Sequence, residues 1–389
     1  LNNFGTILVA GSAQAEINNS GTLWNQGTLQ IYSRFNNLAG KLINQGQVVL
    51  DGSIVNKGGA TFINNATLRV RGGPLTNELG GLVENAGTWS SLTGSTLYNN
   101  GLTNNRGTMS AVSVFNQGRF TNFAGAVLNS GPGVVKNQAG GMLINHGTIN
   151  VADSHFDLDA GSDYDFTGGT LNNNALGHIS FRRNFTFGEA KAGVVNLSGA
   201  GSLHNYATLR VAQGFTQLAG GSVTNANGGV IDIAGTLRSM DLFNQAGARL
   251  LNSGTIEVLD VLVNQGQFSN KGLVQISSGQ LINQSGATLD NLGRITLGAG
   301  ALINRGTLNN GGPNATNARL ELDGPPSSWD FTGGTLNNRA NGTLLIRYTG
   351  FVLGDARSGT VNLGSGGKVL VDSGSSLTNL AGHTQTNHG

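Results

Sequence analysis

The chain has 389 residues, of which 63 are glycine and 48 are asparagine, while charged residues make up only 11%. Ordinary globular proteins contain about 7% glycine and about 25% charged residues, so this composition is unusual. The formal charge of +2, without a basic stripe, excludes the electrostatic footprint of nucleic-acid binding. No apolar run approaches about 18 residues, so no transmembrane helix is expected. The absence of cysteine excludes disulfides and thiolate metal sites.

A short motif recurs along the whole chain: asparagine, any residue, glycine, a small residue and then an aliphatic residue. In chain order, its asparagines first recur about every 20 residues at Asn44, Asn65, Asn85 and Asn105. The same spacing returns at Asn244, Asn264, Asn283 and Asn304, and a second series runs beside it at Asn252, Asn270 and Asn291. The repeating unit is therefore about 20 residues long, with two asparagine-glycine corners in each unit.

The segments between the corners alternate apolar and polar residues with a period of two. Residues 67–70, 208–211, 289–292 and 294–297 are examples. Such segments, rich in Thr, Val, Ile and Leu, are typical of strands of three to five residues. Asparagine and glycine at the corners suggest bends with positive φ. No helical period of useful length is present.

A 20-residue unit of short strands cannot bury its apolar side alone, but it can when it is stacked on its neighbours. We therefore predict an all-β, right-handed parallel β-helix of about 19 coils, forming a rod of roughly 90 Å. Like positions in successive coils should stack, which would place Asn244, Asn264, Asn283 and Asn304 in one structural ladder. Asparagine ladders are favourable because each amide both donates and accepts a hydrogen bond.

A longer repeat lies on top of the short one. The sequence from Asp165 to Asn173 recurs from Asp330 to Asn338, and the match continues beyond it. Residues 1–389 are therefore expected to form one continuous rod of tandem modules of about 160–180 residues, with approximate boundaries near residues 165 and 330. The chain begins and ends inside modules, as a piece of a longer array would. Residues 309–328 contain an insertion and Pro325-Pro326, so an irregular protruding loop is expected there.

The densest acidic stretch is the candidate for a metal site. Asp157, Asp159, Asp163 and Asp165 could together chelate Ca²⁺, which prefers oxygen ligands. The competing interpretation is a strand whose carboxylates simply alternate outward. We expect no catalytic residues, no cofactor apart from this weak calcium candidate, and no other metal. A charged strand position such as Arg294 is expected to tolerate replacement by glutamine.

Units such as Leu42-Ile43-Asn44-Gln45-Gly46 and Leu302-Ile303-Asn304-Arg305-Gly306 resemble the shafts of large bacterial exoproteins. The closest type is the filamentous-haemagglutinin-like adhesins of two-partner secretion, and autotransporter passenger domains are similar. The resemblance covers essentially the whole chain and is one of repeat type. The Asn-Pro-Asn motifs of that family's secretion domain are absent. The resemblance implies a protein secreted or displayed at the bacterial cell surface.

Two functions remain open on this basis. The first is an extracellular structural and adhesive shaft that makes cell–cell, cell–surface or biofilm-matrix contacts and forms filaments with further copies of the same repeat. Its receptor would be a host-cell or matrix polysaccharide or protein. The alternative is a carbohydrate-active β-helix enzyme, such as a polysaccharide lyase or depolymerase. Such an enzyme needs a non-repeating acidic groove, whereas a shaft repeats its surface.

Overall fold

The computed structural model describes residues 1–9, 16–91, 95–111, 113–174, 176–197, 201–213, 216–323, 329–347, 350–353, 357 and 359–379. The chain is an all-β parallel solenoid that divides into two compact units. Unit 1 contains Leu1–Arg183 and Glu189–Ser202, and unit 2 contains Asn184–Gly188 and Leu203–Gly389. That these units form one continuous rod with module boundaries near residues 165 and 330 stays a prediction.

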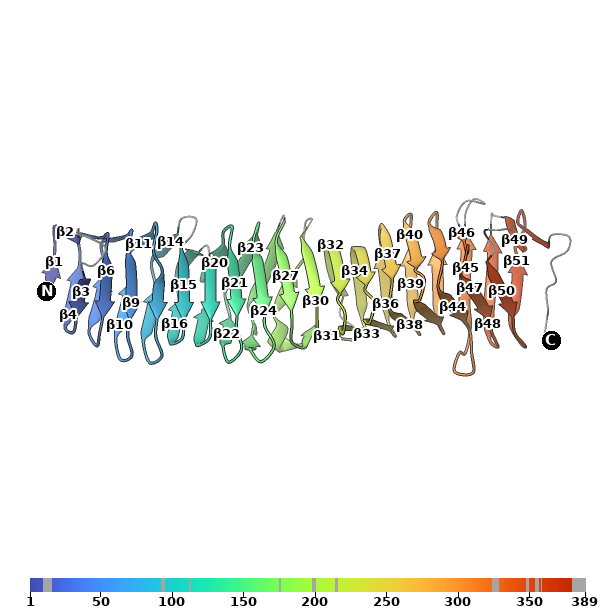
Figure 1. Ribbon diagram of the computed structural model, residues 1–389, viewed down its shortest axis with the longest axis horizontal. Helices are drawn as coiled ribbons and strands as arrows, with labels where there is room; N and C mark the ends of the chain where they lie inside the picture. Colours follow the sequence, from blue (N-terminus) through green and yellow to red (C-terminus); the bar gives the residue numbers. More distant parts are fainter. Residues whose placement is uncertain are drawn as a thin grey trace. The chain divides into compact units, whose positions relative to one another are not determined.

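Unit 1 is built from three parallel sheets, and each coil adds one strand to each sheet (Figure 1). Sheet 1 contains β1 (Asn2–Asn3), β4 (Thr22–Asn25), β7 (Lys41–Asn44), β10 (Thr61–Asn64), β13 (Leu82–Asn85), β16 (Leu102–Asn105), β19 (Arg119–Asn122), β22 (Met142–Asn145) and β25 (Asp163–Asp165). Sheet 2 contains β2 (Thr6–Val9), β5 (Thr28–Ile31), β8 (Gln47–Leu50), β11 (Thr67–Val70), β14 (Thr88–Ser91), β17 (Thr108–Ala111), β20 (Val127–Ser130), β23 (Thr148–Ala152), β26 (Thr170–Asn174) and β29 (Val194–Asn196). Sheet 3 contains β3 (Glu16–Asn19), β6 (Arg34–Asn37), β9 (Ser53–Asn56), β12 (Leu75–Asn77), β15 (Thr96–Asn99), β18 (Ser113–Asn116), β21 (Val134–Asn137), β24 (His155–Leu158) and β27 (His178–Phe181).

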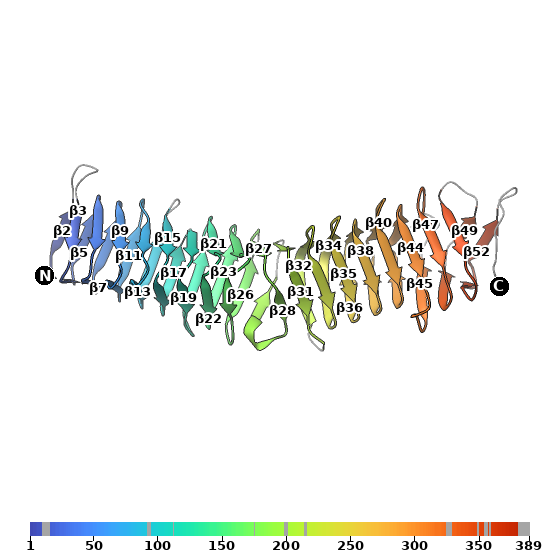
Figure 2. The same cartoon turned by 60° about the horizontal axis from the view of Figure 1, so that its bottom comes forward.

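Unit 2 repeats this construction, and Figure 2 shows its strands from β31 to β47 in coil order. Sheet 4 contains β28 (Phe185–Phe187), β31 (Thr208–Val211), β33 (Val230–Ile233), β35 (Arg249–Asn252), β38 (Gln267–Asn270), β41 (Thr288–Asn291), β44 (Thr307–Asn310), β47 (Thr335–Asn338) and β50 (Thr360–Leu363). A second face begins with β30 (Ser202–Asn205) and the long strands β32 (Thr216–Asn225) and β34 (Thr236–Asn244). From β34 one row continues through β36 (Thr255–Val258), β39 (Leu273–Ile276), β42 (Arg294–Leu297), β45 (Ala318–Asp323), β48 (Gly342–Arg347) and β51 (Lys368–Val371). The other row continues through β37 (Val261–Asn264), β40 (Gln280–Asn283), β43 (Ala301–Asn304) and β46 (Trp329–Asp330), while β49 (Gly350–Leu353) pairs with β52 (Ser376–Asn379).

The predicted fold class is confirmed. The solenoid has about 16 turns of about 21 residues, close to the predicted count. Helical backbone in the described residues is limited to the 3-10 turn η1 (Ala190–Ala192) and to a 3-10 position at Arg357. In the same part of the chain, no helix is long and apolar enough to cross a membrane.

The core lies inside the coils because the second and fourth residues of most strands point inward. In β11, for example, Leu68 and Val70 are buried while Thr67 and Arg69 face outward. Parallel pairing places Leu68 beside Val48 in one neighbouring coil and Trp89 in the other. A one-residue slip would turn every apolar side chain outward, so the hydrophobic pattern holds the register.

Glycine serves two different purposes at the corners. A Cβ on Gly46, in an Asn-x-Gly corner, would lie 2.1 Å from the Gly27 carbonyl oxygen of the neighbouring coil. Gly46 is therefore required by close backbone approach and has no positive φ, contrary to the expectation from sequence. Where one more residue is inserted after the asparagine, the glycine does adopt positive φ, as Gly286 does at 81°.

The segment predicted to be irregular, residues 309–328, has regular and irregular parts. Asn309 and Asn310 end β44, and β45 pairs in register with β42 and β48. Between them, Gly311 and Gly312 have φ values of 89° and 141°. Residues 324–328 lie outside the described part of the chain.

Candidate functional site

The structure brings the four predicted ladder asparagines of unit 2 into one hydrogen-bonded column. The Nδ2 atom of Asn244 donates to Oδ1 of Asn264 at 2.7 Å. Asn264 donates in turn to Asn283 at 2.8 Å, and Asn283 donates to Asn304 at 2.7 Å. All four residues end their strands and are at most 1% exposed. The column therefore lies inside the solenoid, at the corner that follows each of these strands.

Each buried amide in this column satisfies its hydrogen-bonding groups. Besides its bond to Asn304, Asn283 donates from Nδ2 to the Thr307 carbonyl at 3.0 Å, and its Oδ1 accepts from Asn264. An amide suits this position because it carries two N–H donors and a carbonyl acceptor. An aspartate would stack like charges one strand spacing apart, and an aliphatic side chain would leave buried carbonyls without a partner.

Unit 1 has ladders of the same kind, with one change from the expected residues. Asn44 donates to Asn64 at 2.7 Å, and Asn64 donates to Asn85 at 2.7 Å. The sequence series assigned Asn65 to this column, which is wrong: Asn65 follows the strand in an exposed turn position, whereas Asn64 is 1% exposed. Two adjacent asparagines gave the spacing argument no means to choose between them.

A second type of ladder, on the outer surface, was missed by the sequence reasoning. On sheet 2, Asn150 donates to Asn129 and Asn172 donates to Asn150, each at 2.8 Å. On sheet 4, Asn337 donates to Asn309 at 2.8 Å, and Asn309 donates to Asp290 at 2.7 Å. The signal was the Thr-x-Asn pattern of β23, β26, β44 and β47, in which the asparagine side chain points to the same outer face as the threonine side chain.

The four calcium candidates do not share a ligand set. Asp157 faces outward on β24, as the alternation of that strand predicts. Asp159 forms an ion pair with Lys136 at 3.1 Å, and Asp165 accepts from the Thr167 hydroxyl at 2.7 Å. Within the described residues, no group of three or more His, Asp or Glu side chains is placed to hold a metal ion.

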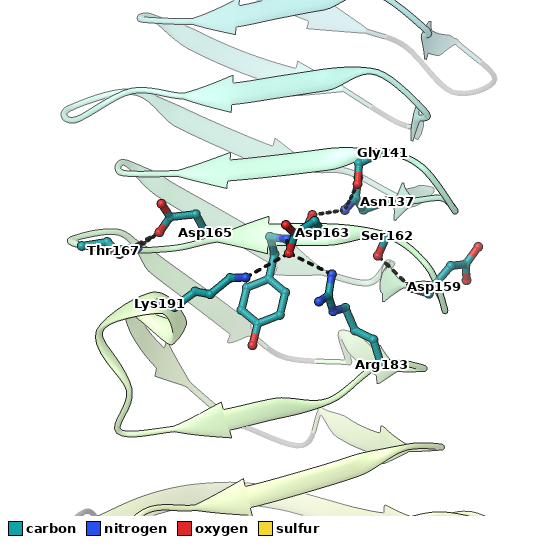
Figure 3. A network of polar contacts seen from close by, with 10 residues as sticks. Asn137, Gly141, Asp159, Ser162, Asp163, Asp165, Thr167, Arg183 and Lys191 are labelled. Carbon is teal, nitrogen blue, oxygen red and sulfur yellow. Dashed lines mark hydrogen bonds and ion pairs between the residues drawn. The ribbon is translucent and has the colours of Figure 1, made fainter.

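Asp163 is the centre of a small charged network at the end of sheet 1 (Figure 3). Its Oδ1 atom accepts from Lys191 Nζ at 2.9 Å and from Arg183 at 3.2 Å. Below these cations lies the ring of Tyr164, 4.8 Å from the Arg183 guanidinium and 4.9 Å from the Lys191 ammonium. The Tyr164 residue is only 4% exposed, so the two cations close the apolar interior where sheet 1 stops.

The backbone of the same segment protects the edge of β25. Lys191 contributes its carbonyl oxygen, which accepts from the Phe166 N–H at 2.8 Å. Gly193 then turns back with φ of 61°, at a place where a Cβ would lie 2.2 Å from the Phe166 carbonyl oxygen. Covering a terminal strand with a charged segment is a common means of preventing edge-to-edge association.

The repeated module carries a counterpart of this cap in unit 2. The guanidinium of Arg357 lies 4.9 Å from the ring centre of Trp329, which is 2% exposed. The Arg357 carbonyl accepts from the Phe331 N–H at 2.6 Å, and Gly359 has φ of 57°. Tyr164 with Lys191 and Trp329 with Arg357 are therefore two versions of one device.

The hydrogen bonds of this region control the protonation of its carboxylates. Donation from Lys191, with a smaller contribution from the Tyr164 N–H, lowers the pKa of Asp163 below its ordinary value of 3.8. The Thr167 hydroxyl and N–H lower the pKa of Asp165, and Thr332 does the same for Asp330. These three groups remain ionised at neutral pH, which makes them poor general acids.

One carboxyl group behaves in the opposite way. Burial raises the pKa of Asp241, and the nearby negative charge of Asp260 raises it further, although a hydrogen bond from the Val261 N–H opposes the shift. Asp241 and Asp260 were not selected from the sequence, because their separation in the chain hides their proximity in adjacent coils. A raised pKa beside a second carboxylate is the environment expected of an acid–base pair.

The contacts of Arg294 disagree with the prediction that this charged strand position tolerates replacement by glutamine. Its guanidinium contacts Glu321 at 2.9 Å, and Glu321 is 0% exposed. Arg319 Nε lies 2.6 Å from the same carboxylate, in an ion pair whose alignment falls outside hydrogen-bond geometry. Arg294 therefore supplies well-directed hydrogen bonding to a buried charge.

No protein-family model and no curated protein matches the chain. One similar solved structure is the crystal structure of the TibC-catalysed, hyper-glycosylated 55–350 fragment of TibA. It shares 15% sequence identity with a TM-score of 0.28, and the match covers 97% of this chain and 98% of that chain.

We expect Asn283→Leu to lower the free energy of unfolding by about 1–3 kcal/mol, because it leaves buried amide and carbonyl groups without partners. The control is Asn227→Leu, which makes the same chemical change at an exposed corner of unit 2. Urea unfolding monitored by circular dichroism measures both. Equal midpoints for Asn283→Leu and the parent would contradict the role of the buried column.

Asp163→Asn should lower Tm at pH 7 by the equivalent of roughly 0.2–1 kcal/mol, the range of exposed ion pairs. A carboxyl whose pKa is lowered by folding contributes stability above its unfolded pKa, and this contribution is lost as pH falls through the folded pKa. The difference in Tm from the parent should therefore persist at pH 5 and fade below pH 3.8. Asp157→Asn is the control. A difference that is unchanged at low pH would show that the charge of Asp163 has no part in it.

Arg294→Gln is now expected to destabilise unit 2 by about 1–3 kcal/mol, because Glu321 keeps only the poorly aligned Arg319 and a long hydrogen bond from the Thr296 hydroxyl at 3.4 Å. Arg339→Gln, at an exposed position, should change little. The cost of Arg294→Gln should shrink when Glu321→Gln is already present. Thermal unfolding of the four members of this double-mutant cycle tests the coupling, and additive effects would refute it.

Proposed function

We propose that this chain is a structural and adhesive shaft of a large repetitive bacterial protein that is secreted or displayed at the cell surface. The observation that carries the proposal is the repetition of buried asparagine columns from coil to coil in both units. Each coil presents an outer surface and supplies the hydrogen bonds needed by the next coil. Such a construction extends a binding surface by adding repeats.

The duplicated cap supports the same proposal. Tyr164 with Lys191 and Trp329 with Arg357 occupy matching places in the two modules. A device that recurs with the module is characteristic of architecture, because a catalytic centre is usually unique to one part of a chain. The cell–cell, cell–surface or biofilm-matrix contacts, the two-partner-secretion route and filament formation with further copies belong to this proposal.

The alternative is a carbohydrate-active enzyme, and a specific observation identifies its best candidate residues. General acid catalysis at neutral pH needs a carboxyl group with a raised pKa beside a second carboxylate. Asp163, Asp165 and Asp330 have lowered pKa values, whereas Asp241 beside Asp260 has a raised one. The double variant D241N/D260N therefore separates the two functions.

Beads coated with the folded chain should attach under flow to bacterial cells and to surfaces carrying their matrix, and they should bring cells together. Heat-unfolded chain is the control for non-specific stickiness. Beads carrying D241N/D260N should attach as well as those carrying the parent. Attachment no greater than that of uncoated beads would overturn the proposal.

The same preparations should release no reducing ends or unsaturated sugars from matrix polysaccharide. If the parent releases such sugars and the D241N/D260N variant does not, the shaft proposal is wrong and the enzyme alternative is supported.

A further inference from the structure

A polar groove of about 640 Å³ lies on the outer surface of sheet 4 in unit 2. It crosses four adjacent strands, β33, β35, β38 and β41, and runs from Asp232 at one end to Asp290 at the other. These ends are three strand spacings apart, or about 14 Å. The groove is therefore long enough for a short segment of a polymer that crosses the strands.

The groove is hollow because its central outward residue is small. Register pairing aligns Asp232, Leu251, Ser269 and Asp290 in one outward column. Ser269 forms the low point of this column. Arg249 and Gln267 lie along one side, and Lys271 follows β38 on the other side.

Arg249 and Gln267 also line a second hollow. It has a volume of about 470 Å³ and lies toward the corner that contains Gly247 and Gly286. The long side chains of Arg249 and Gln267 thus stand between two hollows, and an extended ligand in either one can reach them.

The acidic and basic side chains that line the groove differ in whether they already have a partner within the protein. Asp232 is paired with Arg210 at 3.0 Å, and Asp290 accepts from Asn309 at 2.7 Å. In contrast, the side chains of Arg249, Gln267 and Lys271 have no hydrogen bond or ion pair within the described residues. Asp232 is thus neutralised by Arg210, and Asp290 keeps its negative charge at one end of the groove. Two cations and an amide donor are free, so the groove favours an anionic ligand beside Arg249 and Lys271.

The remaining lining indicates what kind of anion fits. Gln267, Ser269 and Thr288 offer amide and hydroxyl groups that suit a ligand rich in hydroxyls. Phe268 is 1% exposed and offers no ring face, so neutral sugars lack a stacking surface here. The lining also has no deep apolar pocket for the side chains of a peptide.

We propose that this groove binds an acidic oligosaccharide, with its anionic group between Arg249 and Lys271 and its hydroxyls on Gln267, Ser269 and Thr288. The inference rests on the proposed adhesive function and names the class of polymer that this surface recognises. The two long cations, on neighbouring coils, can approach this anionic group from opposite sides of the groove. Binding weakens with salt because the site is exposed.

The test is isothermal titration calorimetry of the full chain with four probes at low and moderate ionic strength. The probes are oligogalacturonate, its carboxyl-reduced neutral form, a heparin-derived sulfated oligosaccharide and oligoglutamate. Oligogalacturonate or the sulfated sugar should bind, and the relative affinities identify carboxylate or sulfate as the preferred anion. Binding of the neutral form with equal affinity, of oligoglutamate alone, or of no probe would overturn the proposal.

The variant R249Q/K271Q should reduce affinity about tenfold or more, since two charged donors are lost. The control R69Q/R71Q removes the same charge at exposed positions on and just after β11 and should leave affinity within about twofold. Circular dichroism melting confirms that both variants fold. Equal losses in the two variants would show non-specific attraction to positive charge and refute the site.

The bead assay separates this proposal from the adhesive function itself. Beads of R249Q/K271Q that attach like the parent, with no acidic sugar bound by either protein, would refute the groove and leave the shaft in place. Parent beads that fail to attach would refute the shaft.

Discussion

A hydrogen bond between the side-chain amides of buried asparagines in neighbouring coils is the interaction on which this fold depends. Each amide gives one N–H to the next asparagine and the other to a carbonyl at the adjacent corner, as Asn283 does with Asn304 and Thr307. The polar corner of every coil is thereby satisfied inside the protein. Apolar stacks such as Leu68 beside Trp89 can then be buried without leaving unpaired polar groups. The column also holds the register, because only one residue per corner can join it.

This constraint fixes the corner and leaves the rest of the coil free to vary. Successive ladder asparagines are 17 residues apart from Asn105 to Asn122 and 28 apart from Asn310 to Asn338, yet both pairs are hydrogen-bonded. Extra residues therefore leave the column as loops and caps, at a modest cost in loop entropy. The cap around Asp163 is one such addition. It closes the apolar interior at Tyr164 with two cations where sheet 1 ends.

The asparagine columns also account for the low proportion of charged residues in the chain. Interior corners need amides, and amide columns recur outside at Asn150 and Asn172, so few positions remain for charged residues. Many of the charged groups that do occur form ion pairs, as Asp163 does with Lys191 and Glu321 does with Arg294. The unpaired Arg249 and Lys271 line the groove of unit 2, where a ligand can reach them. The asparagine columns that stack the coils thus lie in the interior, whereas the groove proposed to bind a ligand lies on the outer face.

The sequence by itself determined the strand-and-corner pattern, the coil length and the column of Asn244, Asn264, Asn283 and Asn304. These features follow from the alternation of residues within a strand and from the spacing between motifs. In a stack of coils of similar length, residues one coil length apart in the sequence become neighbours. Only the tertiary structure decided matters that depend on which side chain turns inward. It chose Asn64 over the adjacent Asn65, and it replaced the positive φ expected at Gly46 by close backbone approach.

The acidic stretch also shows the difference between what the sequence determined and what the tertiary structure decided. The sequence grouped Asp157, Asp159, Asp163 and Asp165 because they are close in the chain, but their side chains found different partners. Lys191 reaches Asp163 from 28 residues away, and Lys136 reaches Asp159 from an earlier coil. The burial of Glu321 against Arg294 and the nearness of Asp260 to Asp241 have the same origin. In a solenoid the decisive neighbour of a side chain lies one coil away, and the choice depends on side-chain direction and loop path, which spacing alone does not specify.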